Sequence, residues 1–278
     1  WSTVFKTLSL SGNNAKLYVE TQASTAKGKG TTRLVARLLD AKGKAVAQKN
    51  LTTNTQGAAS AQFDVANAKV WSPEQPHLYT LEINLYQGNK LVDRLRQRVG
   101  IRTIAVSKEH GFQLNGVSRK FKGVCLHHDL GPLGAAVNKA AIIRQIRLMK
   151  DMGVDAIRTS HNMPSQMQME VCDSMGMMVM AESFDAWKEA KVKNGYNLFY
   201  DTWWRKDLEN LIRGHRNHPA IVMWSIGNEI PEQWNKEGAA RAKAMTEYCH
   251  ELDNTRPVTC GGDNPKANTE CGFFAALD

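Results

Sequence analysis

The first part of the chain shows apolar residues that alternate with polar ones over short segments. Leu81, Ile83 and Leu85 recur at every second position, which is the period of a half-buried β-strand. Turn-forming residues interrupt these segments at 40–43 and 87–90. Roughly seven short strands in about 105 residues are typical of an immunoglobulin-like β-sandwich. The sequence therefore predicts such a sandwich over residues 1–107.

From residue 108 to residue 278 the pattern changes to strands that alternate with helices. Five apolar runs predict strands at residues 121–126, 155–158, 177–181, 221–225 and 257–260, and the first of them is expected to be short and buried. Amphipathic segments between them predict helices at 138–152, with Ile142, Ile146, Met149 and Met152 inward, from Ser165 to Gly176, at 203–213 and at 237–252. A further strand is expected to begin near Phe273.

Repeated strand–helix units indicate a parallel sheet covered by helices. No GxGxxG turn occurs, so a (β/α)8 TIM barrel is favoured over a dinucleotide-binding fold. Five or six strands are too few to close a barrel of eight. We therefore expect a fragment of a longer enzyme: a sandwich, then about five βα units of an incomplete TIM barrel at 108–278. The start at Trp1 without a Met is what a removed N-terminus would leave.

Composition narrows the function classes. The formal charge is +9, but the cationic residues are scattered along the sequence and no nucleic-acid-binding motif is present, so no nucleic-acid partner is expected. No apolar run approaches the ~20 residues of a membrane span, so no membrane partner is expected either. The five cysteines are odd in number and form no CxxC pair, which argues against a disulfide framework.

Polar residues follow each apolar run, where a barrel carries its chemistry. They are His127, His128 and Asp129; Arg158, Thr159, Ser160, His161 and Asn162; Glu182 and Asp185; Asn228 and Glu229; and Gly261, Gly262 and Asp263. Carboxylates and amides beside aromatic residues suit a sugar. Cleaving a glycosidic bond needs a carboxylic acid and a second carboxylate. Glu229, which follows an apolar strand and an amide, is the best candidate for the acid.

Several motifs, in order along the chain, resemble glycoside hydrolase family 2. They are WSPEQPHLY at 71–79, VGIR at 99–102, GFQLNG at 111–116, KGVCLHHD at 122–129, RTSH at 158–161 and RNHPAI at 216–221 followed by WSIGNE at 224–229. A lone Asn-Glu pair would be weak evidence for the resemblance. The set of motifs in the same order is strong evidence, and it covers nearly the whole chain. The segment ESFDAW at 182–187 looks most like the β-galactosidase branch.

The resemblance implies roles for the matching residues. Glu229 would be the catalytic acid/base, and Asn228 would bind the hydroxyl next to the anomeric carbon. The other substrate-binding candidates are Asp129, His161, Glu182, Arg158 and His128. Alternatives remain for four of them: a structural or hydrogen-bonding role for His128, a loop cap for Asp129, a structural ion pair for Arg158, and a position behind the sugar-contacting residues for Glu182. The family's nucleophilic Glu would lie beyond Asp278. Glu270 is no substitute, because it is expected in a polar loop.

These observations predict a retaining exo-β-glycosidase that acts on terminal β-linked sugars, with a β-galactosidase first and β-glucuronidase or β-mannosidase as alternatives. We expect this chain to be inactive alone, because half of the catalytic pair is missing. A non-catalytic carbohydrate-binding fragment is an alternative of another class. A metal-dependent hydrolase with ligands from His127, His128, His161, Glu182 and Asp263 is disfavoured, because adjacent histidines on an extended segment point to opposite faces.

The expected partner is a β-galactoside-like carbohydrate. No cofactor is required and no metal ligands are assigned, although a divalent cation is left open, as is a homo-oligomer. The residues do not reveal the compartment. The family resemblance alone favours a periplasmic or secreted bacterial protein.

Overall fold

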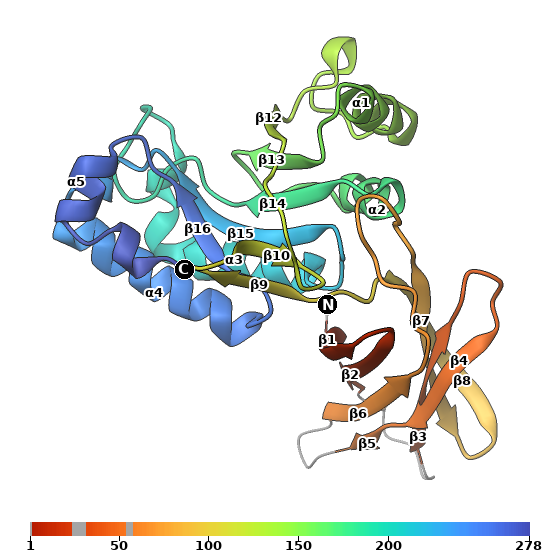
Figure 1. The fold of residues 1–278 in the computed structure, drawn as a ribbon. Helices are drawn as coiled ribbons and strands as arrows, with labels where there is room; N and C mark the ends of the chain where they lie inside the picture. Colours follow the sequence, from red (N-terminus) through yellow and green to blue (C-terminus); the bar gives the residue numbers. More distant parts are fainter. Residues whose placement is uncertain (1, 24–31, 54–57) are drawn as a thin grey trace. The chain divides into compact units, whose positions relative to one another are not determined.

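The computed structural model describes residues 2–23, 32–53 and 58–278. It divides into two compact units, which are described separately (Figure 1). One unit comprises residues Trp1–Arg119 and Arg216–Pro219, and the other comprises Lys120–His215 and Ala220–Asp278. The domain boundary expected at 107/108 stays a prediction.

The first unit contains the predicted immunoglobulin-like sandwich, which is confirmed as two four-stranded antiparallel sheets. The strand orders are β1-β2-β6-β5 and β4-β3-β7-β8. The strands are β1 (Val4–Ser11), β2 (Asn14–Gln22), β3 (Thr32–Leu39), β4 (Ala45–Asn50), β5 (Thr52–Thr53), β6 (Ala58–Val65), β7 (Tyr79–Gln87) and β8 (Lys90–Val99).

The core of the sandwich lies between these two sheets. Leu17 and Phe63 of the first sheet are buried in one cluster with Leu38, Leu81 and Ile83 of the second. Alternate residues of a strand point to opposite faces, so Leu81 and Ile83 point into this core, while Glu82 and Asn84 point to the other face of the sheet and are buried there. The predicted inward positions in β7 are therefore confirmed.

Two further parts of this unit were not predicted. A small antiparallel sheet of order β11-β10-β9 is formed by β9 (Ile104–Ser107), β10 (Gly111–Leu114) and β11 (Val117–Ser118). The segment Arg216–Pro219 belongs to this unit through its contacts. The side-chain oxygen of Asn217 accepts a 2.9 Å hydrogen bond from the Phe5 amide, and Arg102 Nε donates to Pro219 O at 2.8 Å.

The second unit confirms the incomplete TIM barrel as a five-stranded parallel sheet of order β12-β13-β14-β15-β16 (Figure 1). Its strands are β12 (Gly123–His127), β13 (Ala156–Ser160), β14 (Met178–Glu182), β15 (Ile221–Asn228) and β16 (Val258–Gly261). The helices are α1 (Lys139–Asp151), α2 (Gln166–Met175), α3 (Tyr200–His215), α4 (Lys236–Leu252) and α5 (Pro265–Glu270), with 3-10 turns η1 (Gly131–Leu133), η2 (Tyr196–Leu198), η3 (Pro231–Trp234) and η4 (Phe274–Ala276).

Helix ends follow the predicted signals. The Ser165 side chain accepts a hydrogen bond from the Gln168 amide at the start of α2, and Gly176 ends that helix at φ 69°. A hydroxyl satisfies a free amide of the first turn, and glycine takes the left-handed conformation at no steric cost. Asn138 caps α1 in the same way, through the Ala141 amide.

Three expectations were wrong. The first strand is not buried: β12 begins at Gly123 and is half-buried to exposed throughout, because it pairs with β13 only. Met152 does not face the core; it caps α1 and is 78% exposed. The residues after Phe273 form η4 instead of a strand, while Phe273 itself is buried against Trp187, with ring centroids 5.9 Å apart.

No helix in residues 2–23, 32–53 and 58–278 is both long and apolar enough to cross a membrane. All five cysteines lie in the described part of the chain and are free thiols. Burial raises the pKa of the Cys172, Cys249 and Cys260 thiols, so these three behave as small apolar residues.

Candidate active site

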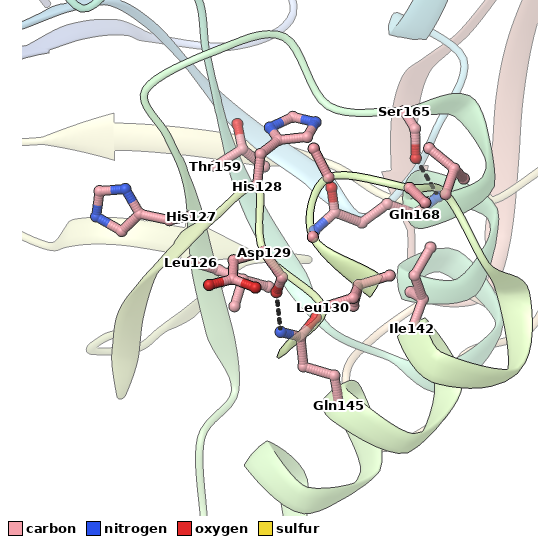
Figure 2. Close-up of a pocket in the computed structure, with 14 residues that line it drawn as sticks. Leu126, His127, His128, Asp129, Leu130, Ile142, Gln145, Thr159, Ser165 and Gln168 are labelled. Atoms are coloured by element: carbon pink, nitrogen blue, oxygen red, sulfur yellow. Dashed lines mark hydrogen bonds between the residues drawn. The ribbon is translucent and has the colours of Figure 1, made fainter. Parts of the chain in front are cut away.

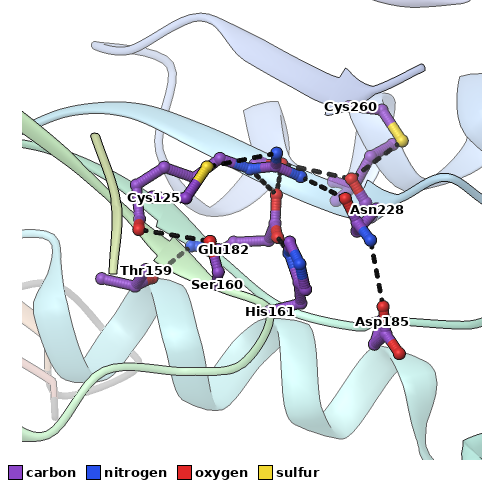
Figure 3. A network of polar contacts seen from close by, with 12 residues as sticks. Cys125, Thr159, Ser160, His161, Glu182, Asp185, Asn228 and Cys260 are labelled. Atoms are coloured by element: carbon purple, nitrogen blue, oxygen red, sulfur yellow. Dashed lines mark hydrogen bonds and ion pairs between the residues drawn. The ribbon is translucent and has the colours of Figure 1, made fainter. Parts of the chain in front are cut away.

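Glu182 is the centre of a polar network at the carboxyl ends of β13, β14 and β15 (Figure 3). Its carboxylate is fully buried. One oxygen accepts hydrogen bonds from Arg158 Nε at 2.7 Å and Ser225 Oγ at 2.5 Å, and the other shares a 2.7 Å hydrogen bond with His161 Nδ1. A carboxylate this deep is tolerated only with such partners. Both oxygens are thus engaged within the protein.

Arg158 connects Glu182 to Asn228. Its Nη2 donates to the Asn228 side-chain oxygen at 2.9 Å while its Nε donates to Glu182. Burial by itself would lower the pKa of Arg158, but the hydrogen bond and charge of Glu182 outweigh it and raise that pKa. The neighbouring Gly261 leaves room for the guanidinium, because a Cβ there would lie 2.4 Å from Nη2.

The other end of the Asn228 amide is held by Asp185 and Lys191. Asn228 Nδ2 donates to Asp185 Oδ1 at 3.1 Å, and Lys191 Nζ donates to the same oxygen at 3.0 Å and to the Asn228 carbonyl at 2.6 Å. Burial would raise the pKa of Asp185, but hydrogen bonds from Lys191 and Asn228 lower it. Asn228 is therefore fixed through both side-chain atoms and through its backbone.

Glu229 follows directly and lies at φ 44°, in the left-handed region. Its amide donates to the Gly261 carbonyl at 2.6 Å, which ties the end of β15 to the end of β16. The residue is exposed, and no hydrogen bond reaches its carboxylate from the residues described in the structure. A carboxylate that stays available beside a fixed amide can exchange protons with a bound ligand.

His128 and Asp129 lie in the loop after β12, beside a pocket that α1 and α2 also line (Figure 2). Asp129 Oδ1 accepts a hydrogen bond from the Gly131 amide at 2.7 Å, and both residues are exposed. Figure 2 shows the rings of His127 and His128 pointing in different directions. His127 meets the His161 ring edge-on, with centroids 5.1 Å apart.

The structure therefore joins Arg158, His161, Glu182 and Asn228 by hydrogen bonds and adds Glu229 through the chain. Within the described ranges, no hydrogen bond connects His128 or Asp129 to this network. The same ranges contain no group of three or more His, Cys, Asp or Glu side chains placed to hold a metal ion.

Two residues of the network were missed by the sequence reasoning, and two others were noted without a role. Ser225 was missed although a hydroxyl inside the apolar run of β15 was a usable signal. Lys191 lies in the loop after β14, and nothing in its local sequence marks it. Thr159, whose Oγ1 accepts from the Glu182 amide at 3.0 Å, and Asp185 were noted only as strand-end residues.

Two family models match the chain over most of its length. Residues 2–102 match glycosyl hydrolases family 2, and residues 104–275 match the TIM barrel domain of glycosyl hydrolases family 2. The chain belongs to glycosyl hydrolase family 2. The resemblance drawn from its motifs is thereby confirmed.

Named relatives of this family 2 chain are glycoside hydrolases. A β-galactosidase of Bacteroides ovatus is 34% identical over 100% of this chain and 37% of its own length. The human β-glucuronidase is 33% identical over 84% of the chain and 36% of its own length. A family 2 member from Bacteroides cellulosilyticus has a solved structure with a TM-score of 0.93 at 37% identity, covering 100% of this chain and 36% of that one. The chain thus spans little more than a third of these proteins.

Proposed function

We propose that this chain is the sandwich and the first part of the catalytic barrel of a retaining exo-β-glycosidase, with Glu229 as its general acid/base. The main support for this proposal is that the Asn228 side chain is held at both ends: its oxygen accepts a hydrogen bond from Arg158, and its nitrogen donates one to Asp185. This sets the orientation of an amide directly beside an available carboxylate. Membership of family 2 supports the same assignment.

In the proposed mechanism, Glu229 first protonates the leaving oxygen while a second carboxylate attacks the anomeric carbon. Glu229 then removes a proton from the water that hydrolyses the covalent intermediate. Asn228 binds the hydroxyl next to the anomeric carbon, and His161, Asp129 and His128 contact other hydroxyls. Arg158 and Glu182 act as positioning residues, because their charged groups are directed at each other and at Asn228.

No residue of this chain is proposed as the nucleophile. Glu182 is fully buried and both of its oxygens face partners inside the protein, so neither is directed at a site where an anomeric carbon could bind. Glu270 lies on the short helix α5 and is 66% exposed, 4.0 Å from Lys266. We therefore propose that the 278-residue chain has no turnover by itself. Hydrolysis of a nitrophenyl β-galactoside by the pure chain above the rate of its Glu229→Gln variant would contradict this.

For the sugar we propose a β-galactoside first. The Bacteroides ovatus β-galactosidase matches the full chain. In the described part of the site both cations already face carboxylates, Arg158 with Glu182 and Lys191 with Asp185. A uronic acid would need a cation for its own carboxylate. A β-glucuronidase is the second candidate, supported by the human relative. Relative kcat/KM values of the full-length protein on nitrophenyl β-galactoside, β-glucuronide and β-mannoside decide between them.

The role of Glu229 is tested by Glu229→Ala in the full-length protein that contains this chain. General acid catalysis contributes about 10²–10⁴-fold, and an activated aryl leaving group needs little of it. We expect a far larger loss of kcat/KM on an alkyl galactoside than on the nitrophenyl galactoside. Glu237→Ala, on the exposed first turn of α4, is the matched control and should leave kcat/KM unchanged on both substrates. Equal losses on both substrates for Glu229→Ala would refute the assignment.

A further inference from the structure

One face of the sandwich gathers cationic residues that are scattered in the sequence. Arg94, Arg96 and Arg98 alternate along β8 and therefore point to the same side of the sheet. Arg96 lies opposite Glu82 of β7, which lies opposite Arg37 of β3. Arg33 falls on the same side, two positions before Val35 and four before Arg37. We call this surface the arginine face; it consists of Arg33, Arg37, Arg94, Arg96 and Arg98.

The arginine face has a strong excess of positive charge. Among the described side chains on this side of β4, β3, β7 and β8, Glu82 is the one acid against five guanidinium groups. Glu82 is fully buried, and Arg37 and Arg96 reach its carboxylate at 2.9 and 2.7 Å. Burial would raise the pKa of Glu82, but hydrogen bonds from Asn84, Arg96 and Arg37 lower it. The carboxylate therefore stays charged and anchors the arginines above it.

Four of the five arginines are held by contacts with the sheet, and these contacts leave some of their N–H donors free. Arg94 Nε donates to the Asn84 side-chain oxygen at 2.9 Å, and the Arg33 guanidinium lies 4.4 Å from the centre of the Tyr86 ring. Arg37 keeps 35% of its side chain exposed and Arg96 keeps 57%. A guanidinium has five N–H donors, and the contacts to the sheet take only one or two of them. The remaining donors of several fixed guanidinium groups are available to a ligand.

The chemistry of such a surface selects acidic groups. A guanidinium fork matches a carboxylate or a sulfate with two parallel hydrogen bonds. Alternate residues on one strand are about 7 Å apart and neighbouring strands about 4.8 Å apart, so the arginines of β3 and β8 extend over several residues and suit an extended polymer. The amides of Gln48 and Asn50 on the adjoining β4 edge can bind hydroxyls. The Tyr86 ring is covered by Arg33, which disfavours ring stacking as the mode of binding.

We propose that the arginine face is a binding site for an acidic polysaccharide, which it holds through carboxylate or sulfate groups. The site lies in the sandwich unit and shares no residue with the Glu182 network, so it does not depend on the proposed catalytic role. Its ligand differs from a short neutral sugar in being extended and charged.

The test uses the purified 278-residue chain and isothermal titration at low and moderate salt. The probes are polygalacturonate for carboxylates, dextran sulfate for sulfates, and uncharged dextran. We expect at least one charged polymer to bind, and we expect its binding to weaken as salt is added, because exposed charges are screened over about 10 Å at 0.1 M. Dextran should not bind. Absence of binding to both charged polymers at low salt would overturn the proposal.

The decisive variant is Arg94→Gln/Arg96→Gln/Arg98→Gln, which we expect to weaken binding about tenfold or more, since tenfold is only about 1.4 kcal/mol over three charge-assisted contacts. The matched control Lys193→Gln/Lys243→Gln/Lys266→Gln removes the same charge from exposed positions of the other unit. It should change the affinity less than threefold. Equal weakening by both variants would show binding to net charge alone and refute a site on this face.

A second variant and a DNA titration complete the test. If the triple variant does not fold, as judged by circular dichroism, Arg33→Gln/Arg98→Gln replaces it, because neither residue is bonded to Glu82 among the contacts seen. This pair should still weaken binding relative to Lys243→Gln/Lys266→Gln. A duplex DNA of similar charge is titrated in parallel. Binding of DNA as tight as that of the better polysaccharide would count against a polysaccharide site.

Discussion

The two units each bury a glutamate that is bound by arginine, and the two glutamates have different surroundings. Glu82 lies under a face of the sandwich, and its arginines come from neighbouring antiparallel strands and remain half-exposed. Glu182 lies at the ends of parallel strands, and its partners Arg158 and His161 are about four-fifths buried. Antiparallel pairing spreads charge over a face, whereas parallel strands collect their polar ends at one edge. Strand direction therefore distinguishes the Glu82 contact, which lies under a face of a sheet, from the Glu182 contact, which lies in the proposed active site.

The strongest test of this difference is Glu182→Gln in the full-length protein. The amide would place a donor against Arg158 or His161 in place of an acceptor, and Asn228 would lose its orientation. We expect kcat/KM on the nitrophenyl β-galactoside to fall on the order of 10²–10³-fold, because small displacements at a reacting centre are costly. Glu74→Gln is the control, since Glu74 pairs with Arg119 while 63% exposed, and should stay within about twofold. Comparable losses of kcat/KM for Glu182→Gln and Glu74→Gln would contradict the special role of the buried glutamate.

A third acid, Asp253, shows how complete burial of both partners affects an ion pair. Asp253 and Arg256 are both almost fully buried, and Asp253 also accepts a 3.0 Å hydrogen bond from Trp224 Nε1. Burial would raise the pKa of Asp253, but the charge of Arg256 and the hydrogen bonds from Thr255 lower it to about 2. Breaking such a pair from one side leaves a buried charge. Asp253→Asn should lower the free energy of unfolding of the chain by about 3 kcal/mol in urea titrations at neutral pH.

The same pair predicts a pH dependence of stability. The folded pKa of Asp253 is below the unfolded value of about 3.9, so its contribution is complete above that pH and is lost as pH falls towards 2. The difference in unfolding free energy between the chain and Asp253→Asn should shrink over this interval. Asp201→Asn, at a 70% exposed position, provides the reference. A difference that stays constant down to pH 2 would contradict the prediction.

A milder change separates the geometry of Arg158 from its charge. In Arg158→Lys the charge remains, but a single ammonium cannot reproduce the fork between Glu182 and Asn228. We expect kcat to fall about tenfold with little change in KM, because the arrangement acts on the reacting centre more than on binding. Arg213→Lys, which keeps an ion pair within α3, is the matched control. An unchanged kcat with lowered thermal stability would assign Arg158 a structural role only.

The smallest effect is expected on the sandwich. Arg37→Gln removes one of several arginines from Glu82, and the Arg37 side chain is 35% exposed. We expect a loss of about 0.2–1 kcal/mol in the free energy of unfolding, reduced further at high salt. Urea unfolding at two salt concentrations measures it. A loss as large as that of Asp253→Asn would mean that exposure does not weaken the contact.

Most of the fold could be predicted because periodicity and helix-end signals are local. Ser165 and Gly176 delimit α2 through atoms a few residues away. The strands β9, β10 and β11 have two to four residues each, too short for a periodic pattern. The exposure of β12 depends on how many neighbours it has, which its own residues do not encode.

The site was predictable to the extent that strand ends determine it. Glu182, Asn228, Arg158 and His161 were assigned together by that rule, and they are bonded in the structure. Lys191 reaches Asn228 across a separate loop, so only coordinates reveal it. The arginine face is intermediate: the alternation of Arg94, Arg96 and Arg98 was readable, but their alignment with Arg37 requires the strand register.

The backbone at Glu229 has a consequence for the evolution and engineering of this family member. At φ 44° a residue with a Cβ is strained by about 1 kcal/mol, a strain that glycine does not have. Glu229→Gly is thus expected to abolish the proposed proton transfer while leaving the chain at least as stable. A search for heat-resistant variants would therefore favour substitutions such as Glu229→Gly, which remove the carboxylate. Stability selection therefore has to be run on the full-length protein, together with a screen for turnover.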